Sequence, residues 1–319
     1  MGAQQRVFRR KIRSIQSTEK ITKAMEMIAS SRIVKAQKAL DSAVPYTRAL
    51  FDAISATASH AAGVEKHPLT AKARLEKRAI YLVITADRGL AGAYSINAIR
   101  EGEALTTLLK KERGFEEVIP YVVGRKGVGY YNFRERETGG EWVGFSDQPD
   151  YAHAKEIADQ LLERFLLRTE DGGADEIHVV YTHFVNMVTQ QPRVRRILPL
   201  EVVEEEVDIS GGHIGRADNE AAEDKPIFPL YDFEPGANAV LDELLPRYVE
   251  NAVYAALLMS AASEHAARRR ACKSATDNAK ELIKTYTRLA NQARQAEITQ
   301  EISEIVGGAD ALASATAGS

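Results

Sequence analysis

The residues best placed to bind a ligand form the run Thr-Ala-Asp-Arg-Gly-Leu-Ala-Gly at 85–92, directly after a strand-like apolar segment. Such a turn is where a doubly wound sheet binds its ligand. A dinucleotide site needs Gly-x-Gly-x-x-Gly, but only Gly89 and Gly92 are present, and no Gly-x-x-x-x-Gly-Lys-Ser/Thr run occurs anywhere. The sequence therefore predicts a tight strand-to-helix turn, and a dinucleotide-dependent enzyme is only a minor alternative.

Metal and nucleophile chemistry finds little support in the residue types and their spacing. The single cysteine, Cys272, excludes an intrachain disulfide and a cysteine-based zinc site. No two histidines have the i, i+4 spacing of a helical metal pair with a third ligand nearby. We predict no catalytic residue, no cofactor site and no metal site, and structural or surface roles for the histidines, which are His60, His67, His153, His178, His183, His213 and His265.

Charge is distributed unevenly although the formal net charge is only -3. Residues 1–40 contain ten basic and two acidic side chains, residues 268–295 contain eight and two, and residues 201–224 contain nine acidic side chains against one arginine. Two basic segments could bind nucleic acid, but they fit a shaft inside an acidic partner equally well. The acidic stretch is typical of a solvated loop.

The two ends of the chain are predicted to be long helices. Between residues 3 and 62 there is no glycine and one proline, and between residues 247 and 306 there is neither. Apolar residues recur mostly at helical steps, and we expect them to form one stripe on each helix. Because so long a helix cannot bury its stripe in one compact core, we expect the two to pair, with a helical bundle as the alternative. The expected stripe residues are Ile12, Ile15, Ile21, Met25 and Ile28 at one end, and Leu282, Tyr286, Leu289, Ala293 and Ala296 at the other.

The middle of the chain alternates between strand-like and helix-like segments, which predicts a mostly parallel α/β sheet with right-handed crossovers. Strands are expected at 78–85, 118–123, 177–182 and 196–203, and helices at 94–111, 128–134 and 151–167. The expected domains are an N-terminal helix (1–62), a Rossmann-like α/β domain (75–205), an acidic loop with a further segment (206–236) and a C-terminal helix (237–310). No apolar run approaches the length of a membrane span, so any membrane association is expected to go through a partner.

Four segments, in order along the chain, resemble one protein family, the γ subunits of bacterial F-type ATP synthases. They are Lys-Ile-Thr-Lys-Ala-Met-Glu-Met-Ile-Ala at 20–29, Asp-Arg-Gly-Leu-Ala-Gly at 87–92, the helix at 263–279 with Ser-Glu-His-Ala-Ala-Arg and Ala-Thr-Asp-Asn-Ala, and the closing run at 298–309. Two features depart from the family pattern: Ala91 stands where Cys is frequent, and the acidic loop is longer.

The resemblance implies a non-catalytic rotor whose terminal helices form an antiparallel coiled coil inside a ring of three α and three β subunits. It implies that the Rossmann-like domain lies beside the ε subunit and above a membrane c-ring, peripheral to the cytoplasmic side of the inner membrane. It implies proton-driven rotation coupled to ATP synthesis or hydrolysis, with no cofactor and no nucleic acid partner. The implied contacts to α and β are Lys23, Met25, Glu264, Arg268, Gln295 and Thr299, and the implied c-ring foot is Tyr231, Phe233 and Glu234. A coiled-coil protein that binds nucleic acid through its basic helices is the main alternative.

Overall fold

The computed structural model describes residues 3–60, 69–70, 77–200 and 236–317. Along the chain, the elements are α1 (Ala3–His60), β1 (Arg78–Ile84), α2 (Tyr94–Lys111), β2 (Glu117–Val123), α3 (Arg125–Phe133), β3 (Gly140–Trp142), α4 (Tyr151–Leu166), a 3-10 turn η2 (Thr169–Asp171), β4 (Glu176–Phe184), β5 (Gln190–Leu198) and α5 (Ala237–Ala317). Within these residues, no helix carries an apolar stretch sufficient to cross a bilayer.

Contacts divide the chain into two compact units, and α1 and α5 each contribute residues to both. Unit 1 comprises residues 1–28 and 269–319, and unit 2 comprises residues 29–268. The domains expected from the sequence follow secondary-structure elements rather than contacts, so their boundaries stay a prediction.

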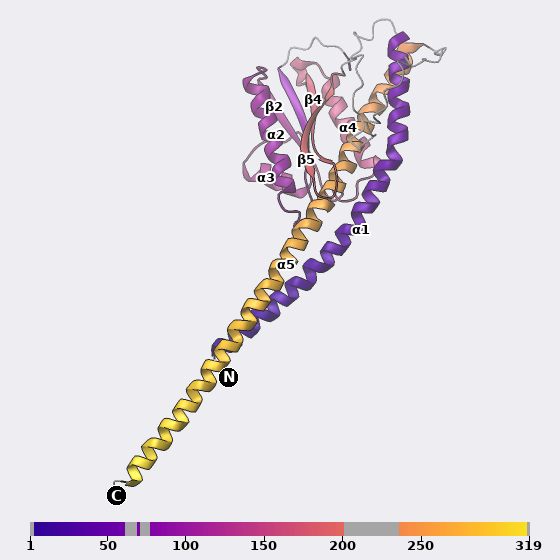
Figure 1. The fold of residues 1–319 in the computed structure, drawn as a ribbon. Helices are drawn as coiled ribbons and strands as arrows, with labels where there is room; N and C mark the ends of the chain where they lie inside the picture. Colours follow the sequence, from indigo (N-terminus) through magenta and orange to yellow (C-terminus); the bar gives the residue numbers. More distant parts are fainter. Residues whose placement is uncertain (1–2, 61–68, 71–76, 201–235, 318–319) are drawn as a thin grey trace. The chain divides into compact units, whose positions relative to one another are not determined.

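Unit 1 is an antiparallel pair of helices, in which the start of α1 lies beside α5 (Figure 1). The Thr22 and Thr276 hydroxyls are hydrogen-bonded at 2.7 Å, and the rings of Phe8 and Tyr286 are 6.2 Å apart. Steps of three and four connect the less exposed positions of both helices, which is the spacing of a coiled-coil seam. These positions are Gln5, Phe8, Ile12, Ile15, Glu19, Thr22 and Glu26 on α1, and Arg269, Cys272, Thr276, Ala279, Ile283, Tyr286, Ala290, Ala293 and Glu297 on α5.

The seam differs in phase from the stripe expected from the large apolar residues. Ile21 and Ile28 are exposed, whereas Thr22 is buried in the seam. On α5 the seam uses Ile283 rather than its neighbour Leu282, which is exposed. Small and polar side chains let the two backbones approach, so the expected stripe was wrong at these positions. Beyond Glu297, α5 is exposed as far as residue 309.

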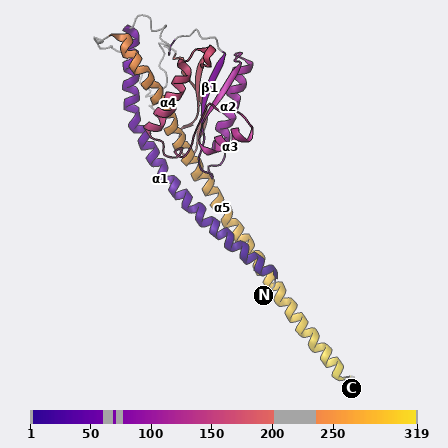
Figure 2. The same cartoon turned by 180° about the vertical axis from the view of Figure 1, so that it is seen from behind.

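Unit 2 is built around a five-stranded sheet of order β3-β2-β1-β4-β5, in which only β5 is antiparallel. Alternate residues of β1 enter different cores, because successive side chains of a strand point to opposite faces. Ile80 and Leu82 pack with α4 and the start of α5, and Tyr81 and Val83 pack with α2 and α3. Figure 2 shows these layers from behind.

Most of the elements expected for the sheet are confirmed, including α2 with the same bounds. The last strand was placed too late: β5 covers Gln190–Leu198 rather than 196–203, because it forms a hairpin with β4. The three-residue β3 was missed, since so short an edge strand has no periodicity to detect.

Both long helices also meet in unit 2, where α5 lies between α1 and the sheet. Every residue of α5 from 256 to 266 is buried, which is typical of a helix covered on all sides. Ile33 of α1 packs with Ala262 and Ala266 of α5 and with Phe184 of β4. Further along, Asn251 donates a 2.8 Å hydrogen bond to the Thr47 hydroxyl.

Candidate functional site

The turn after β1, which the sequence singled out, is organised by the Asp87 carboxylate. It accepts backbone N–H groups from Arg125 (3.1 Å), Gly144 (2.8 Å) and Ser146 (3.0 Å). In return, the Asp87 N–H donates to the Ser146 hydroxyl at 2.8 Å. One buried carboxylate thus holds together the loops that follow three neighbouring strands, β1, β2 and β3.

Arg268 of α5 joins this turn to the long helix. Its guanidinium donates to the carbonyl oxygens of Gly89 (3.3 Å) and Arg88 (3.4 Å) and to Glu264 Oε1 (2.5 Å). The side chains of both Arg268 and Glu264 are almost completely buried. Two segments that resemble the same family, 87–92 and 263–268, therefore form one contact.

The crevice at the carboxyl ends of β1 and β4, where a doubly wound sheet binds ligands, is filled by α5. The Ser263 hydroxyl donates to the Thr182 carbonyl at 2.9 Å, and the Thr182 N–H donates to the Ser260 hydroxyl at 3.3 Å. Ala267 packs on Ala86 and Tyr94 beside them. The side chains of a helix take the place that a nucleotide occupies in dinucleotide-binding sheets.

Asp147, in the loop before α4, links α1, α5 and the β1 turn, and it was not identified from the sequence. Its carboxylate pairs with Arg32 of α1 and lies 3.8 Å from Arg88. Its backbone oxygen accepts a 2.9 Å hydrogen bond from His265 Nε2. Arg32 and His265 are 115 and 118 residues away from it in the chain, so no local pattern could have revealed the cluster.

Burial controls the protonation of the α5 groups in this cluster. It lowers the pKa of His265 from 6.5 to about 4, so the ring is neutral near pH 7 and its Nε2–H can donate to Asp147. The remaining nitrogen, Nδ1, then accepts from Arg268 at 3.5 Å. Burial also raises the pKa of Glu264, against the opposing charge of Arg268.

The other four residues with an implied partner contact lie in unit 1, and three of them are exposed. Lys23, Gln295 and Thr299 are exposed, and Met25 is half-buried. Lys23 pairs with Glu26 at 3.1 Å, and the Thr299 hydroxyl donates to the Gln295 carbonyl at 2.9 Å. The implied foot residues Tyr231, Phe233 and Glu234 lie outside the described residues, as does the acidic stretch 201–224.

The described residues contain no group of three or more His, Cys, Asp or Glu side chains arranged to hold a metal ion. Cys272, the single cysteine, is buried in the seam of unit 1. In the part of the chain that the structure covers, the candidate site is therefore a network that joins elements, together with an outward helical surface.

Relatives with similar sequences share the whole length of the chain. A family model described as ATP synthase matches residues 4–312. The ATP synthase gamma chain of Thermobifida fusca (strain YX) is 58% identical over 100% of both chains. That of Acidothermus cellulolyticus is 58% identical over 98% of both. The nucleic-acid-binding alternative receives no support from these relatives.

Solved structures agree with the fold. A chain of the Euglena gracilis mitochondrial ATP synthase (OSCP/F1/c-ring) has a TM-score of 0.62 at 19% identity, covering 98% of this chain and 95% of its own. A chain of the central stalk and c-ring of the Tetrahymena thermophila mitochondrial ATP synthase has a TM-score of 0.52 at 19% identity, covering 80% and 99%. At this identity the structures support the fold alone. Given the family match and the identity along its full length, this chain belongs to the ATP synthase family, as a gamma chain.

Proposed function

We propose that this gamma chain is the central rotor shaft of an F-type ATP synthase, coupling proton-driven rotation to ATP synthesis or hydrolysis at β subunits. The shaft itself carries out no catalysis. The proposal rests on the 58% identity to a gamma chain along the full length of the sequence. It is supported by an antiparallel helix pair that presents an outward surface. A helix pair resists twisting because rotation strains many seam contacts at once.

The proposed partners are an α and β hexamer, three copies of each for one copy of this chain, together with an ε subunit and a membrane c-ring. Tyr231, Phe233 and Glu234 are proposed to face the c-ring. Attachment through that ring would hold the chain at the cytoplasmic side of the inner membrane as a peripheral subunit. Proton transport belongs to the membrane part of such a complex and reaches this chain only as rotation.

The outward surface of unit 1 is the proposed contact with α and β. It carries exposed apolar side chains, Ile21, Met27, Ile28 and Leu282, which are 46–64% exposed. Exposed Lys23, Gln295 and Thr299 and half-buried Met25 lie on the same two helices. Apolar groups left outside a coiled-coil seam indicate a surface that another protein covers.

Glu264 and Arg268 need a different role in the free chain. Both are buried and paired with each other, so neither side chain offers a surface to a partner in this conformation. Their contact with α and β stays a prediction that requires the pair to be uncovered first. Arg268 fixes α5 to the β1 turn, and Glu264 accepts a hydrogen bond from the same guanidinium.

The shaft changes nucleotide affinity only as far as it binds the open and closed states of a β subunit differently. Its two helices differ in sequence, so three equivalent β subunits meet three different faces. Contacts between exposed charged side chains are worth only about 0–1 kcal/mol each, so they can break and re-form during a turn.

The experiment is to replace Gln295 and Thr299 together by Ala in the assembled complex and to measure protons pumped per ATP hydrolysed. We expect the number of protons pumped per ATP hydrolysed to fall about twofold, because an outward contact is lost. A twofold change corresponds to about 0.4 kcal/mol in the equilibrium between coupled and uncoupled states. The thermal midpoint of the chain should hardly change, since both side chains are exposed. Lys111→Ala, at the exposed end of α2, is the matched control and should leave coupling intact.

Unchanged coupling together with a lowered thermal midpoint would show that these residues serve folding and not partner contact. Purification of the native complex tests the partners separately. A ratio other than three α and three β subunits to one copy of this chain would contradict the rotor assignment.

A further inference from the structure

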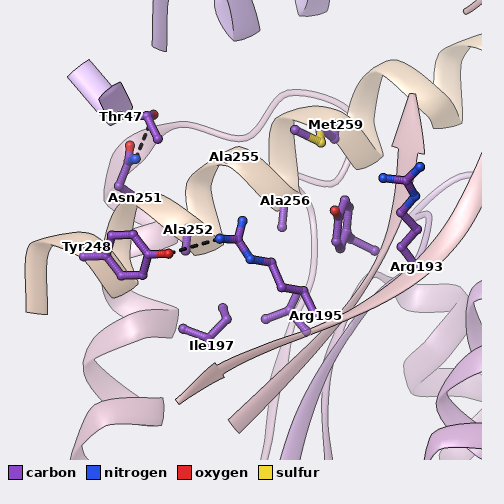
Figure 3. A pocket seen from close by; sticks show the side chains of 12 residues that line it. Thr47, Arg193, Arg195, Ile197, Tyr248, Asn251, Ala252, Ala255, Ala256 and Met259 are labelled. Carbon is purple, nitrogen blue, oxygen red and sulfur yellow. Dashed lines mark hydrogen bonds between the residues drawn. The ribbon is translucent and has the colours of Figure 1, made fainter. Parts of the chain in front are cut away.

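A small pocket in unit 2 lies between the β4–β5 hairpin and α5, away from the network around Asp87 and Arg268 (Figure 3). Its floor is the face of the sheet on which Arg193 stands directly across from Tyr181, and Arg195 directly across from Val179. Its wall is formed by α5, with Thr47 of α1 at one end. The cavity volume is about 50 Å³, which suits a small ion but not a nucleotide.

The hollow exists because α5 presents small side chains opposite long ones. Ala252, Ala255 and Ala256 face the strand that carries the two arginines. A methyl group cannot reach across to the sheet, so the described side chains leave a space beside the Arg195 guanidinium. The hydroxyl of Tyr248 and the amide of Asn251 border the same space from α5.

The pocket concentrates positive charge without a balancing carboxylate among the described residues that line it. Arg195 is half-buried and donates to the Tyr248 hydroxyl at 3.0 Å, which is a neutral partner. Arg193 is exposed and stands two residues away on the same face, at a separation of roughly 7 Å along the strand. By contrast, Arg196 points to the opposite face and lies 3.5 Å from the Glu176 carboxylate.

We propose that this pocket binds a small tetrahedral oxyanion, with inorganic phosphate as the ligand. The Arg195 guanidinium borders the hollow, and the exposed Arg193 side chain extends from the same face of the sheet toward Met259. Each carries N–H donors in the fork geometry that matches phosphate oxygens. Asn251 already uses one amide hydrogen for Thr47 at 2.8 Å and has a second available for the ion. The bound ion supplies a negative charge that none of the described residues lining the pocket provides.

Binding would add a second link between β5 and α5, which the hydrogen bond from Arg195 to Tyr248 already joins at one side of the pocket. A ligand that binds the folded state alone stabilises it in proportion to the logarithm of its concentration. Phosphate would therefore strengthen the attachment of α5 to the sheet within unit 2, independently of any contact with partner subunits.

The test is phosphorus NMR line broadening of inorganic phosphate by the full chain, with ionic strength held constant by chloride. We expect saturable binding at one site in the wild type and at least about a tenfold loss of affinity in Arg195→Gln and in Arg193→Gln. Arg100→Gln, an exposed arginine on α2, is the matched control and should bind phosphate like the wild type. Arg195→Lys keeps the positive charge but loses the forked guanidinium donors. Its affinity for phosphate should therefore lie between that of the wild type and that of Arg195→Gln.

Thermal unfolding without phosphate shows whether each variant is folded, and thermal unfolding at millimolar phosphate supplies an independent second readout. The wild-type midpoint should rise with phosphate and not with chloride, while the midpoint of Arg193→Gln should not respond. The proposal is overturned by equal binding in wild type and both glutamine variants, by an equal effect of chloride, or by absence of binding at millimolar phosphate. In those cases the arginines serve only to keep an edge strand solvated.

Discussion

Asp147 connects α1, α5 and the β1 turn of unit 2 through its carboxylate and its backbone oxygen. Its carboxylate holds Arg32 of α1 and approaches Arg88 of the β1 turn, while its backbone oxygen accepts from His265 of α5. Its side chain is 8% exposed and that of Arg32 is 28% exposed, so the pair between them forms largely out of water. Removing one member of such a network leaves the others unpaired, and that cost usually exceeds the value of the contact itself.

Asp147→Asn should lower the free energy of unfolding by about 1–3 kcal/mol, because Arg32 loses its charged acceptor while shape is kept. The measurement is the urea midpoint of the full chain near pH 7. Asp159→Asn removes a carboxylate that pairs with Lys155 at an exposed position. This control should change the free energy of unfolding by less than about 0.5 kcal/mol. Equal effects of the two substitutions would mean that the Asp147 network contributes nothing beyond an ordinary surface pair.

At the scale of elements, the seam of the helix pair changes composition between the units. In unit 1 it includes polar residues such as Gln5, Glu19 and Thr22, and in unit 2 it passes through Ile33 and Leu40. Apolar burial is the main source of helix-packing stability. The unit 2 part of α1 is therefore held more tightly by its own chain, while unit 1 leaves several large apolar side chains, such as Ile21 and Ile28, exposed.

Ile33→Ala should destabilise the chain by about 2–4 kcal/mol, because the side chain is fully buried against Phe184, Ala262 and Ala266. Val34→Ala is the matched control one residue along the helix. Val34 is 46% exposed, and alanine has the better helix propensity, so we expect a change within about 0.5 kcal/mol. Urea unfolding followed by circular dichroism measures both. Similar losses from the two variants would place the seam on the wrong face of α1.

Much of the element pattern could be predicted, and the errors have physical causes. The absence of glycine and the long apolar runs indicated the two terminal helices and the buried strands. The phase of the seam could not be predicted from large apolar residues, because Thr22 is buried and Ile21 is exposed. The bounds of β5 depend on its hairpin pairing with β4. The role of Asp147 could not be predicted, because the residues it contacts lie far away in the chain.

At the scale of the whole molecule, α5 takes part in several of the features discussed above. It forms one side of the helix pair in unit 1, and in unit 2 it carries Arg268 and His265. It also forms one wall of the pocket that Arg193 and Arg195 line. Its side chains, rather than loops, occupy the crevice at the carboxyl ends of β1 and β4.

The buried ionisable groups also give the molecule a defined response to acid. His265 has a pKa of about 4, below its ordinary 6.5, so the unfolded chain takes up its proton first and stability falls between these values. Glu176 is buried, which opposes ionisation, but His178 and Arg113 outweigh this and lower its pKa from 4.5 to about 2. Its stabilising contribution is present above pH 4.5 and is lost as the pH falls toward 2.

Single substitutions should separate the two stages in urea midpoints measured from neutral pH down to about pH 3. His265→Gln keeps a donor for the Asp147 oxygen and should flatten the curve in the upper range only. Glu176→Gln should flatten it in the lower range only, because Arg113 and His178 then lose their anionic partner at every pH. Burial raises the pKa of Glu264, which acts in the opposite direction, so the comparison between variants decides rather than the wild-type slope. Parallel curves for wild type and His265→Gln would mean that the histidine can take up a proton in the folded protein as easily as in the unfolded chain.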